Sequence, residues 1–270
     1  MRTLYINEYI DVTGYGASCP VIVKADDDST YVLKTRYQSN LNLDGDEHAR
    51  RLFDCSIYIE TLSYLLLQTF GFEHIAEIVY LNIDDDAIAD AEHRFKDLYN
   101  EREQMALENI RNSKGLNLGI KWIEDSEGSF SGVTPLPKNF REATINYDAY
   151  FLNPDRDKGN PNILFSKSGS KYFLIDFGNA FEHLFVMDDL YAPDAILRMS
   201  SWYDKYIFDM HYLLFDEIES VKKYRKKFSK DEILKIMDTL PEEWEPNRIK
   251  EEIATILSER IGNRRIFEDA

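Results

Sequence analysis

The sequence predicts an α+β fold in two lobes, with a strand-rich N-lobe and a mostly helical C-lobe. β-branched and aromatic runs are concentrated early in the chain, whereas helical periodicity and helix caps dominate late in it. Between them, a stretch with two glycines and two prolines has the composition of a connector. The 270 residues suit two small lobes, because single cores seldom grow beyond about 250–300 residues. We therefore expect an N-lobe at 1–124, a connector at 125–138 and a C-lobe at 139–270.

The N-lobe is expected to begin with a glycine-containing loop and a β-hairpin. Apolar runs at Val21–Lys24 and Tyr31–Thr35 predict the two strands, and three aspartates with a serine at 26–29 predict the turn. Apolar residues then recur at helical spacing over 54–70. Three further elements are expected: a strand at 76–83, a charged helical insertion at about 84–114 that ends at Gly115, and a strand at 116–123.

Helix signals set the boundaries of the longer elements. Asp54 or Ser56 is the expected cap of the helix over 54–70, and Gly71 is its stop. In the C-lobe we expect first a helix at 140–152 and then a hairpin of 163–165 and 172–175, with its turn at Ser168-Gly169-Ser170. A helix with a capping box of Ser229 and Glu232 follows and ends at Pro241. The last helix is expected to be capped by Asn247 and closed by Gly262.

The charge of the chain argues against two classes of partner. Lys and Arg number 32 and Asp and Glu number 49, so the net charge is −17 at pH 7. Phosphate backbones and anionic lipids repel such a protein, and no apolar run approaches the ~20 residues of a membrane helix. The N-terminus has no apolar signal-peptide core, and Cys19 and Cys55 cannot make a disulfide framework. We expect a cytoplasmic protein that binds neither nucleic acid nor membranes.

The most informative motif joins a polar loop to a strand end. Asp155 is followed five residues later by Asn160, and Asp176-Phe177-Gly178 follows the apolar run of the second hairpin. This order is the base and metal arrangement of kinase-type phosphoryl transfer. Mg²⁺ prefers hard oxygen ligands, which Asn160 and Asp176 supply, and a further carboxylate must lie near the acceptor hydroxyl. We assign Asp155 to that role. Asp157 is its rival, and with Asp157 the metal ligand would be Asn162.

The N-lobe contains a matching set of nucleotide-binding candidates. Lys34 ends the second strand of the hairpin, where a strand lysine contacts ATP phosphates. Glu60 lies among apolar residues of the next helix, where an unpaired carboxylate would be costly to bury. Pairing with Lys34 would remove that cost; a solvated position at the helix edge is the alternative. Gly14, Gly16 and Ser18 form a loop whose backbone amides can bind phosphate, although Cys19 takes the place of the last glycine of G-x-G-x-x-G.

With these residues in place, the sequence resembles the HipA-like kinase family, a branch of the protein-kinase-like superfamily. The resemblance spans about residues 10–262 and is least clear in the insertion at 84–114. Its segments are Ser18–Val21 through Lys34, Glu60–Leu62 with Phe70–Phe72, Gly115–Gly119, Leu152–Leu164 with Ile175–Gly178, and Leu240–Trp244. It implies a two-lobed protein-kinase-like fold and ATP- and Mg²⁺-dependent phosphorylation of a protein serine or threonine. By position it implies Lys34 and Glu60 at the nucleotide, Asp155 as catalytic carboxylate, and Asn160 and Asp176 at the metal.

Two alternatives remain open from the residues. A small-molecule kinase of the aminoglycoside or choline type shares the same Asp-x₄-Asn logic, and a cationic acceptor would suit the acidic chain. The other is a non-catalytic nucleotide-binding scaffold, a pseudokinase. Its active-site positions would usually be incomplete, whereas this chain has all five polar candidates: Lys34, Glu60, Asp155, Asn160 and Asp176. A basic run at 222–227 is either a helix C-terminus or a patch for an acidic partner.

Overall fold

The computed structural model describes residues 1–14, 16, 18–39, 47–95, 100–128, 136–157, 159–181, 228–245 and 249–262. Helices and strands are mixed, as an α+β fold requires. The chain forms two compact units: Met1–Ile57 with Ala76–Ile123, and Tyr58–Ile75 with Glu124–Ala270. Helix α1 (Glu47–Phe70) therefore contributes residues to both units, which a division into consecutive lobes does not anticipate. The assignment of the units to the lobes of a kinase stays a prediction.

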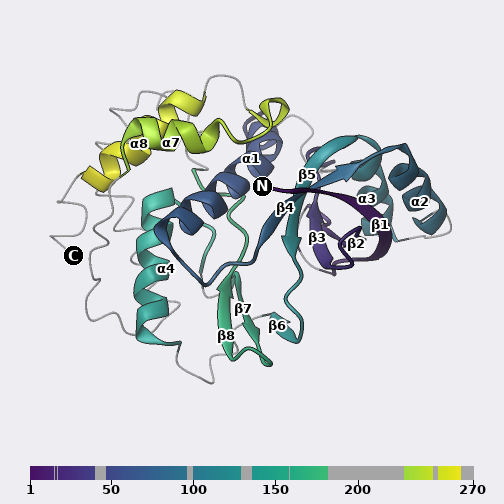
Figure 1. The fold of residues 1–270 in the computed structure, drawn as a ribbon, viewed down its shortest axis with the longest axis horizontal. Helices are drawn as coiled ribbons and strands as arrows, with labels where there is room; N and C mark the ends of the chain where they lie inside the picture. Colours follow the sequence, from purple (N-terminus) through teal and green to yellow (C-terminus); the bar gives the residue numbers. More distant parts are fainter. Residues whose placement is uncertain are drawn as a thin grey trace. The chain divides into compact units, whose positions relative to one another are not determined.

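The first unit contains a closed five-stranded barrel in the order β1-β2-β3-β5-β4 (Figure 1). Its strands are β1 (Thr3–Val12), β2 (Val21–Ala25), β3 (Thr30–Lys34), β4 (Ile78–Ile83) and β5 (Gly115–Lys121). β1 pairs antiparallel with β2 and parallel with β4, and the second pairing closes the barrel. Alternate side chains such as Tyr31 and Leu33 fill the interior, as the period of a strand dictates.

The predicted hairpin of β2 and β3 is confirmed, but β1 is a strand that the sequence pattern did not reveal. The register of β1 against β2 shifts between Ile6 and Glu8 and again between Tyr9 and Asp11. Each irregularity interrupts the alternation of buried and exposed residues on which strand prediction depends. Consequently Leu4 and Tyr9, both buried, are five residues apart.

Gly119 of β5 is required by the close packing inside the barrel. It pairs with Leu33 on one side and Val79 on the other. A Cβ atom at this position would lie 2.7 Å from Cγ of Leu81 and 2.8 Å from Cγ2 of Val79. Because these neighbours belong to the core, a larger residue would force the barrel apart.

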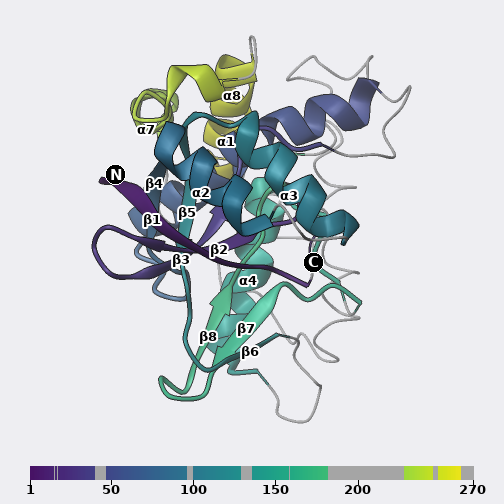
Figure 2. The ribbon, with the colours of Figure 1, turned by 90° about the vertical axis from the view of Figure 1, so that its right-hand side faces the viewer.

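The charged insertion forms two helices where one was expected, α2 (Asp85–Phe95) and α3 (Glu101–Arg111). Asn100 begins the second helix as its N-cap, with its side chain accepting a hydrogen bond from N of Arg102. This cap is a local signal that the prediction of a single helix overlooked. The helices contact each other and β1, and Figure 2 shows them side by side beside the strands.

The second unit combines the later part of α1 with the elements that follow the barrel. These are β6 (Ser126–Gly128), α4 (Lys138–Phe151), β7 (Ile163–Ser166), β8 (Lys171–Leu174), α7 (Lys230–Met237), the 3₁₀ helix η1 (Glu242–Trp244) and α8 (Ile249–Gly262). β7 and β8 form the predicted hairpin, and β6 adds a third antiparallel strand to it. β6 lies in the segment expected to be a connector, of which 129–135 are outside the described residues.

The helix boundaries of this unit confirm some capping predictions and correct others. Ser229 and Glu232 form the predicted capping box of α7, which ends at Met237, before Pro241. Helix α1 begins at Glu47, so neither Asp54 nor Ser56 is its cap. The hydroxyl of Ser56 instead accepts a hydrogen bond from Nε2 of Gln38. The predicted cap Asn247 and the basic run at 222–227 lie outside the described residues.

Among the helices that the structure describes, none is both long and apolar enough to cross a bilayer.

Candidate active site

The loop between α4 and β7 carries the predicted catalytic carboxylate, and it starts from a fixed point. Leu152, the residue directly after α4, lies in the left-handed backbone region with a φ of 50°. The amide of Asn153 donates to the carbonyl of Asp148 at 2.8 Å, and the amide of Phe181 donates to the carbonyls of Phe151 and Leu152 at 3.1 and 3.3 Å. The first residues of the loop are therefore tied to both α4 and the segment after Asp176-Phe177-Gly178.

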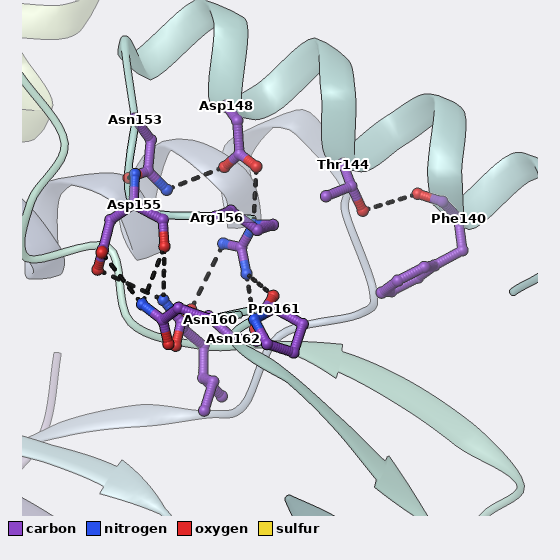
Figure 3. A network of polar contacts seen from close by, with 10 residues as sticks. Phe140, Thr144, Asp148, Asn153, Asp155, Arg156, Asn160, Pro161 and Asn162 are labelled. Atoms are coloured by element: carbon purple, nitrogen blue, oxygen red, sulfur yellow. Dashed lines mark hydrogen bonds and ion pairs between the residues drawn. The ribbon is translucent and has the colours of Figure 1, made fainter. Parts of the chain in front are cut away.

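A buried arginine holds the rest of this loop (Figure 3). Arg156 is 1% exposed, and its Nε donates to Oδ2 of buried Asp148 at 2.7 Å. Its Nη1 donates to the carbonyls of Pro161 and Asn162 at 2.9 and 2.6 Å. The guanidinium thus forms an ion pair with Asp148 and connects the start of the loop to its end at Pro161 and Asn162. The planar group of arginine, with several N–H donors, allows both interactions. Sequence reasoning missed Asp148 and Arg156; an aspartate among apolar residues of α4 was the signal available.

Three amide side chains orient the carboxylate of Asp155. Nδ2 of Asn160 donates to its Oδ1 at 3.0 Å, and Nδ2 of Asn179 donates to its Oδ2 at 2.9 Å. Nδ2 of Asn162 contributes a longer contact to Oδ2 at 3.5 Å and a hydrogen bond to the Asp155 carbonyl at 3.2 Å. The carboxylate is half-buried and held in one orientation. Asn179 is a further site residue that the sequence motif did not identify.

Asp157 has a different task in the same loop. Its Oδ1 accepts hydrogen bonds from the backbone amides of Gly159 and Asn160 at 2.6 and 2.7 Å. This is an Asx-type turn, in which the aspartate serves the backbone of its own loop. The geometry therefore favours Asp155 over Asp157 as the carboxylate that faces an acceptor.

The environment of Asp155 includes a second carboxylate. Burial raises the pKa of Asp155 above its ordinary value, the hydrogen bond from Asn179 opposes the rise, and the negative charge of Asp176 adds to it. The two carboxylates are thus close enough for their charges to interact. A cation near Asp176 would relieve this repulsion.

The backbone around Asp176 is strained and firmly anchored. Asp176 has a φ of 59°, the left-handed region that non-glycine residues rarely adopt. The next residue, Phe177, is fully buried, with its ring edge-on to Tyr64 at 5.3 Å between centroids. The guanidinium of Arg156 lies 5.5 Å from the centre of the Phe177 ring. Anchoring of Phe177 holds the strained Asp176 backbone in place.

Asn160 of the loop and Asp176 after β8 fit a magnesium ion that is bound together with nucleotide. Asp176 offers a carboxylate, and Asn160, whose Nδ2 faces Asp155, offers its amide oxygen. Within the described part of the chain, no group of three or more His, Cys, Asp or Glu side chains is arranged to hold a metal. Mg²⁺ that is bound through phosphates needs only one or two protein carboxylates, because phosphate and water oxygens complete its octahedron.

The nucleotide-binding candidates of the N-lobe are divided between the two units. Lys34 ends β3 in the first unit, half-buried, on the opposite face of the strand from core residue Leu33. Glu60 belongs to the second unit and is 1% exposed, so the alternative of a solvated helix edge is wrong. Their pairing stays a prediction.

The glycine-containing loop follows β1 in the first unit. Gly16 has a φ of 89°, which a glycine adopts without strain, and Cys19 has a φ of 48°. The loop is closed by hydrogen bonds from the amide of Thr13 to the carbonyl of Pro20 and from the amide of Cys19 to the carbonyl of Gly16. Tyr15 and Ala17 lie outside the described residues.

Of the comparisons with known proteins, the one with protein-family models bears on the identity of the chain. No curated protein matches the chain. One similar solved structure is "crystal structure of the Golgi casein kinase with Mn/ADP bound", with 13% sequence identity and a TM-score of 0.40 over 99% of this chain and 74% of that one. A family model described as HipA-like kinase matches residues 6–263. A match over nearly the whole chain confirms the resemblance, so the chain belongs to the HipA-like kinase family and its enzyme class is that of the phosphotransferases.

Proposed function

We propose that this protein is an ATP- and Mg²⁺-dependent serine/threonine protein kinase that transfers the γ-phosphate to a protein hydroxyl. The observation that carries the proposal is the carboxylate of Asp155, which Asn160 and Asn179 hold in one orientation while Asp157 is engaged by backbone amides. A group held in this way suits a reaction in which a carboxylate positions the acceptor hydroxyl and takes its proton.

The candidate site residues have complementary roles in the proposed reaction. Asp155 accepts the hydrogen bond of the acceptor hydroxyl and takes its proton as the new P–O bond forms and the bond to the ADP oxygen breaks. Asn160 and Asp176 would hold Mg²⁺, which when bound neutralises the charge of the phosphates. In the N-lobe, Lys34 contacts the phosphates with Glu60 as its partner, and the backbone amides of Gly14, Gly16 and Ser18 bind them from the loop.

Transfer of labelled phosphate tests the proposal. The purified protein is incubated with γ-labelled ATP and Mg²⁺, alone and with cell lysate, and the label is followed in protein and in small molecules. We expect label in protein with the wild type and none with Asp176→Ala. The variant should also lose Mg²⁺-dependent ATP binding in calorimetry while keeping the wild-type circular dichroism spectrum, because its metal ligand is gone.

The other possible results separate the alternatives. Label in a metabolite would identify a small-molecule kinase of the aminoglycoside or choline type. ATP binding without transfer would identify a pseudokinase scaffold. Unchanged Mg-ATP affinity in Asp176→Ala would show that this carboxylate is not a metal ligand.

A further inference from the structure

Helix α3 of the charged insertion presents one face to the glycine-containing loop. The contacts come from Arg102, Met105 and Asn109, which lie three and four residues apart and therefore on one side of the helix. Met105 contributes a packing contact, with its Sδ 3.4 Å from Sγ of buried Cys19. The other two side chains form hydrogen bonds to the loop backbone.

Arg102 connects two parts of the loop. Its Nη2 donates to the carbonyl of Gly16 at 2.8 Å and to the carbonyl of Thr13 at 3.2 Å. Hydrogen bonds from a charged donor are stronger than neutral ones. One guanidinium therefore fixes the peptide group that precedes Gly14 and the carbonyl group of Gly16.

Asn109 connects the loop to the segment after β3. It is 1% exposed, and its Nδ2 donates to the carbonyl of Ser18 at 3.3 Å. Its Oδ1 accepts from the amide and the hydroxyl of Ser39 at 2.6 and 3.0 Å. Helix α3 thus links the loop to the segment that follows β3, five residues after Lys34, the proposed phosphate-binding lysine.

The direction of these bonds determines where the loop amides point. The C=O and N–H groups of a trans peptide lie on opposite sides of the bond, and no cis peptide occurs in the described residues. When Arg102 binds the carbonyl of Thr13, the amide of Gly14 is turned away from α3. Among the described residues, no heavy atom beyond the chain neighbours of Gly14 lies within 4 Å of a Cβ built on it, so on this side the loop meets no described side chain.

We infer that α3 is a clamp that holds the glycine-containing loop in its nucleotide-binding conformation, with Arg102 and Asn109 as positioning residues for ATP. The inference rests on the proposed function, because it assumes that the loop binds phosphate. A loop ordered before binding loses less conformational entropy when the ligand arrives, which increases affinity.

Hydrogen exchange and calorimetry on the full chain test the clamp. In Arg102→Ala, we expect amides within 13–19 to exchange at least about fivefold faster and the Kd for Mg-ATP to rise about tenfold, with kcat changed less than about twofold. Arg102→Lys, which keeps one cationic donor, should recover part of both effects. Asn109→Ala should change both in the same direction. Asn109 is buried, and its replacement could prevent folding. Arg102 is partly exposed, so the Arg102 variants test the clamp even in that case.

Arg111→Ala is the matched control. It removes the same side chain from the same helix, but Nε of Arg111 binds Oε1 of Glu92 on α2 at 2.8 Å. We expect wild-type exchange in the loop and wild-type affinity for Mg-ATP.

Different results overturn the inference and the function. Unchanged loop exchange in Arg102→Ala, or faster exchange with unchanged Mg-ATP affinity, would overturn the clamp while leaving the kinase assignment intact. A wild-type protein that binds no Mg-ATP would overturn the proposed function, and with it the role of the clamp in nucleotide binding, whatever the exchange rates show.

Discussion

Asp155 and Asp157 lie two residues apart in one loop, and their hydrogen bonds give them different chemistry. The oxygens of Asp155 accept from side-chain amides of Asn160 and Asn179, whereas Oδ1 of Asp157 accepts from two backbone amides. An asparagine at 157 would keep an acceptor oxygen for those amides. An asparagine at 155 would lose the proton acceptor and place an amide group against other amide groups.

These differences predict opposite outcomes for two matched variants. Asp155→Asn should bind Mg-ATP near normally in calorimetry but turn over about 10²–10⁴ times more slowly, because the base is removed and the metal ligands remain. Asp157→Asn should retain most of its activity. A dead Asp157→Asn together with an active Asp155→Asn would show that the register of the loop is wrong and that Asn162 is the metal ligand.

Among the secondary-structure elements, α4 is joined to the loop that carries Asp155 by the buried pair of Asp148 and Arg156. Both side chains are inaccessible to solvent, and Arg156 also binds two backbone carbonyls of the loop. Removing one partner of such a pair leaves an uncompensated buried charge. The pair is therefore expected to be far more sensitive to substitution than an ion pair on the surface.

Urea unfolding of two aspartate variants measures this sensitivity. Asp148→Ala should lower the free energy of unfolding by about 3–5 kcal/mol. Asp238→Ala, which removes the exposed partner of Lys250 in the same unit, should cost at most about 1 kcal/mol. Equal losses in the two variants would contradict a special role for the buried pair.

The barrel has a polar cluster around Tyr31 of β3. The hydroxyl of Tyr31 accepts from Nη2 of Arg2 at 3.0 Å and donates to Oδ2 of Asp27 at 2.9 Å. Burial and the hydrogen bond to Asp27 raise the pKa of Tyr31 to about 12. Since the pKa of an unfolded tyrosine is about 10, the neutral hydroxyl contributes stability that is fully present below pH 10 and is lost as the pH rises through 12.

Tyr31→Phe isolates this contribution. The free energy of unfolding of the wild type should exceed that of the variant below pH 10, and the difference should shrink between pH 10 and 12. Chemical unfolding at several pH values measures it. A difference that is independent of pH over this range would mean that the hydroxyl does not ionise differently in the folded and unfolded states.

At the scale of the whole molecule, the two units share helix α1, and the nucleotide candidates are divided between them. Lys34 belongs to the first unit and Glu60 to the second. A functional coupling between these side chains would therefore be a coupling between the units.

A double-mutant cycle measures this coupling. Lys34→Met and Glu60→Gln should each reduce kcat/KM, and the double variant should lose little more than either single variant. If the two residues act as a pair, either substitution already removes their interaction, so the second removes nothing further. Losses that multiply would show that the two side chains act independently.

Local patterns and fixed spacings in the sequence were enough to predict several features of this protein. The hairpin of β2 and β3, the capping box of α7 and the order of Asp155, Asn160 and Asp176 were all readable, because turn residues, caps and loop motifs act over a few positions. The same spacing led to the kinase family, which the match over 6–263 confirms.

Other features depend on contacts between segments that are far apart in the sequence, and these required the three-dimensional structure. The bulges of β1 hid its alternation, and the closed barrel exists because β1 also pairs with β4, more than sixty residues later. Spacing favoured Asp155 over Asp157; the hydrogen bond from Asn179 and the loop geometry that Arg156 and Asp148 maintain add support to that assignment, which stays a prediction. Hydrogen bonds between distant segments depend on three-dimensional packing, so spacing along the chain does not reveal their partners or directions.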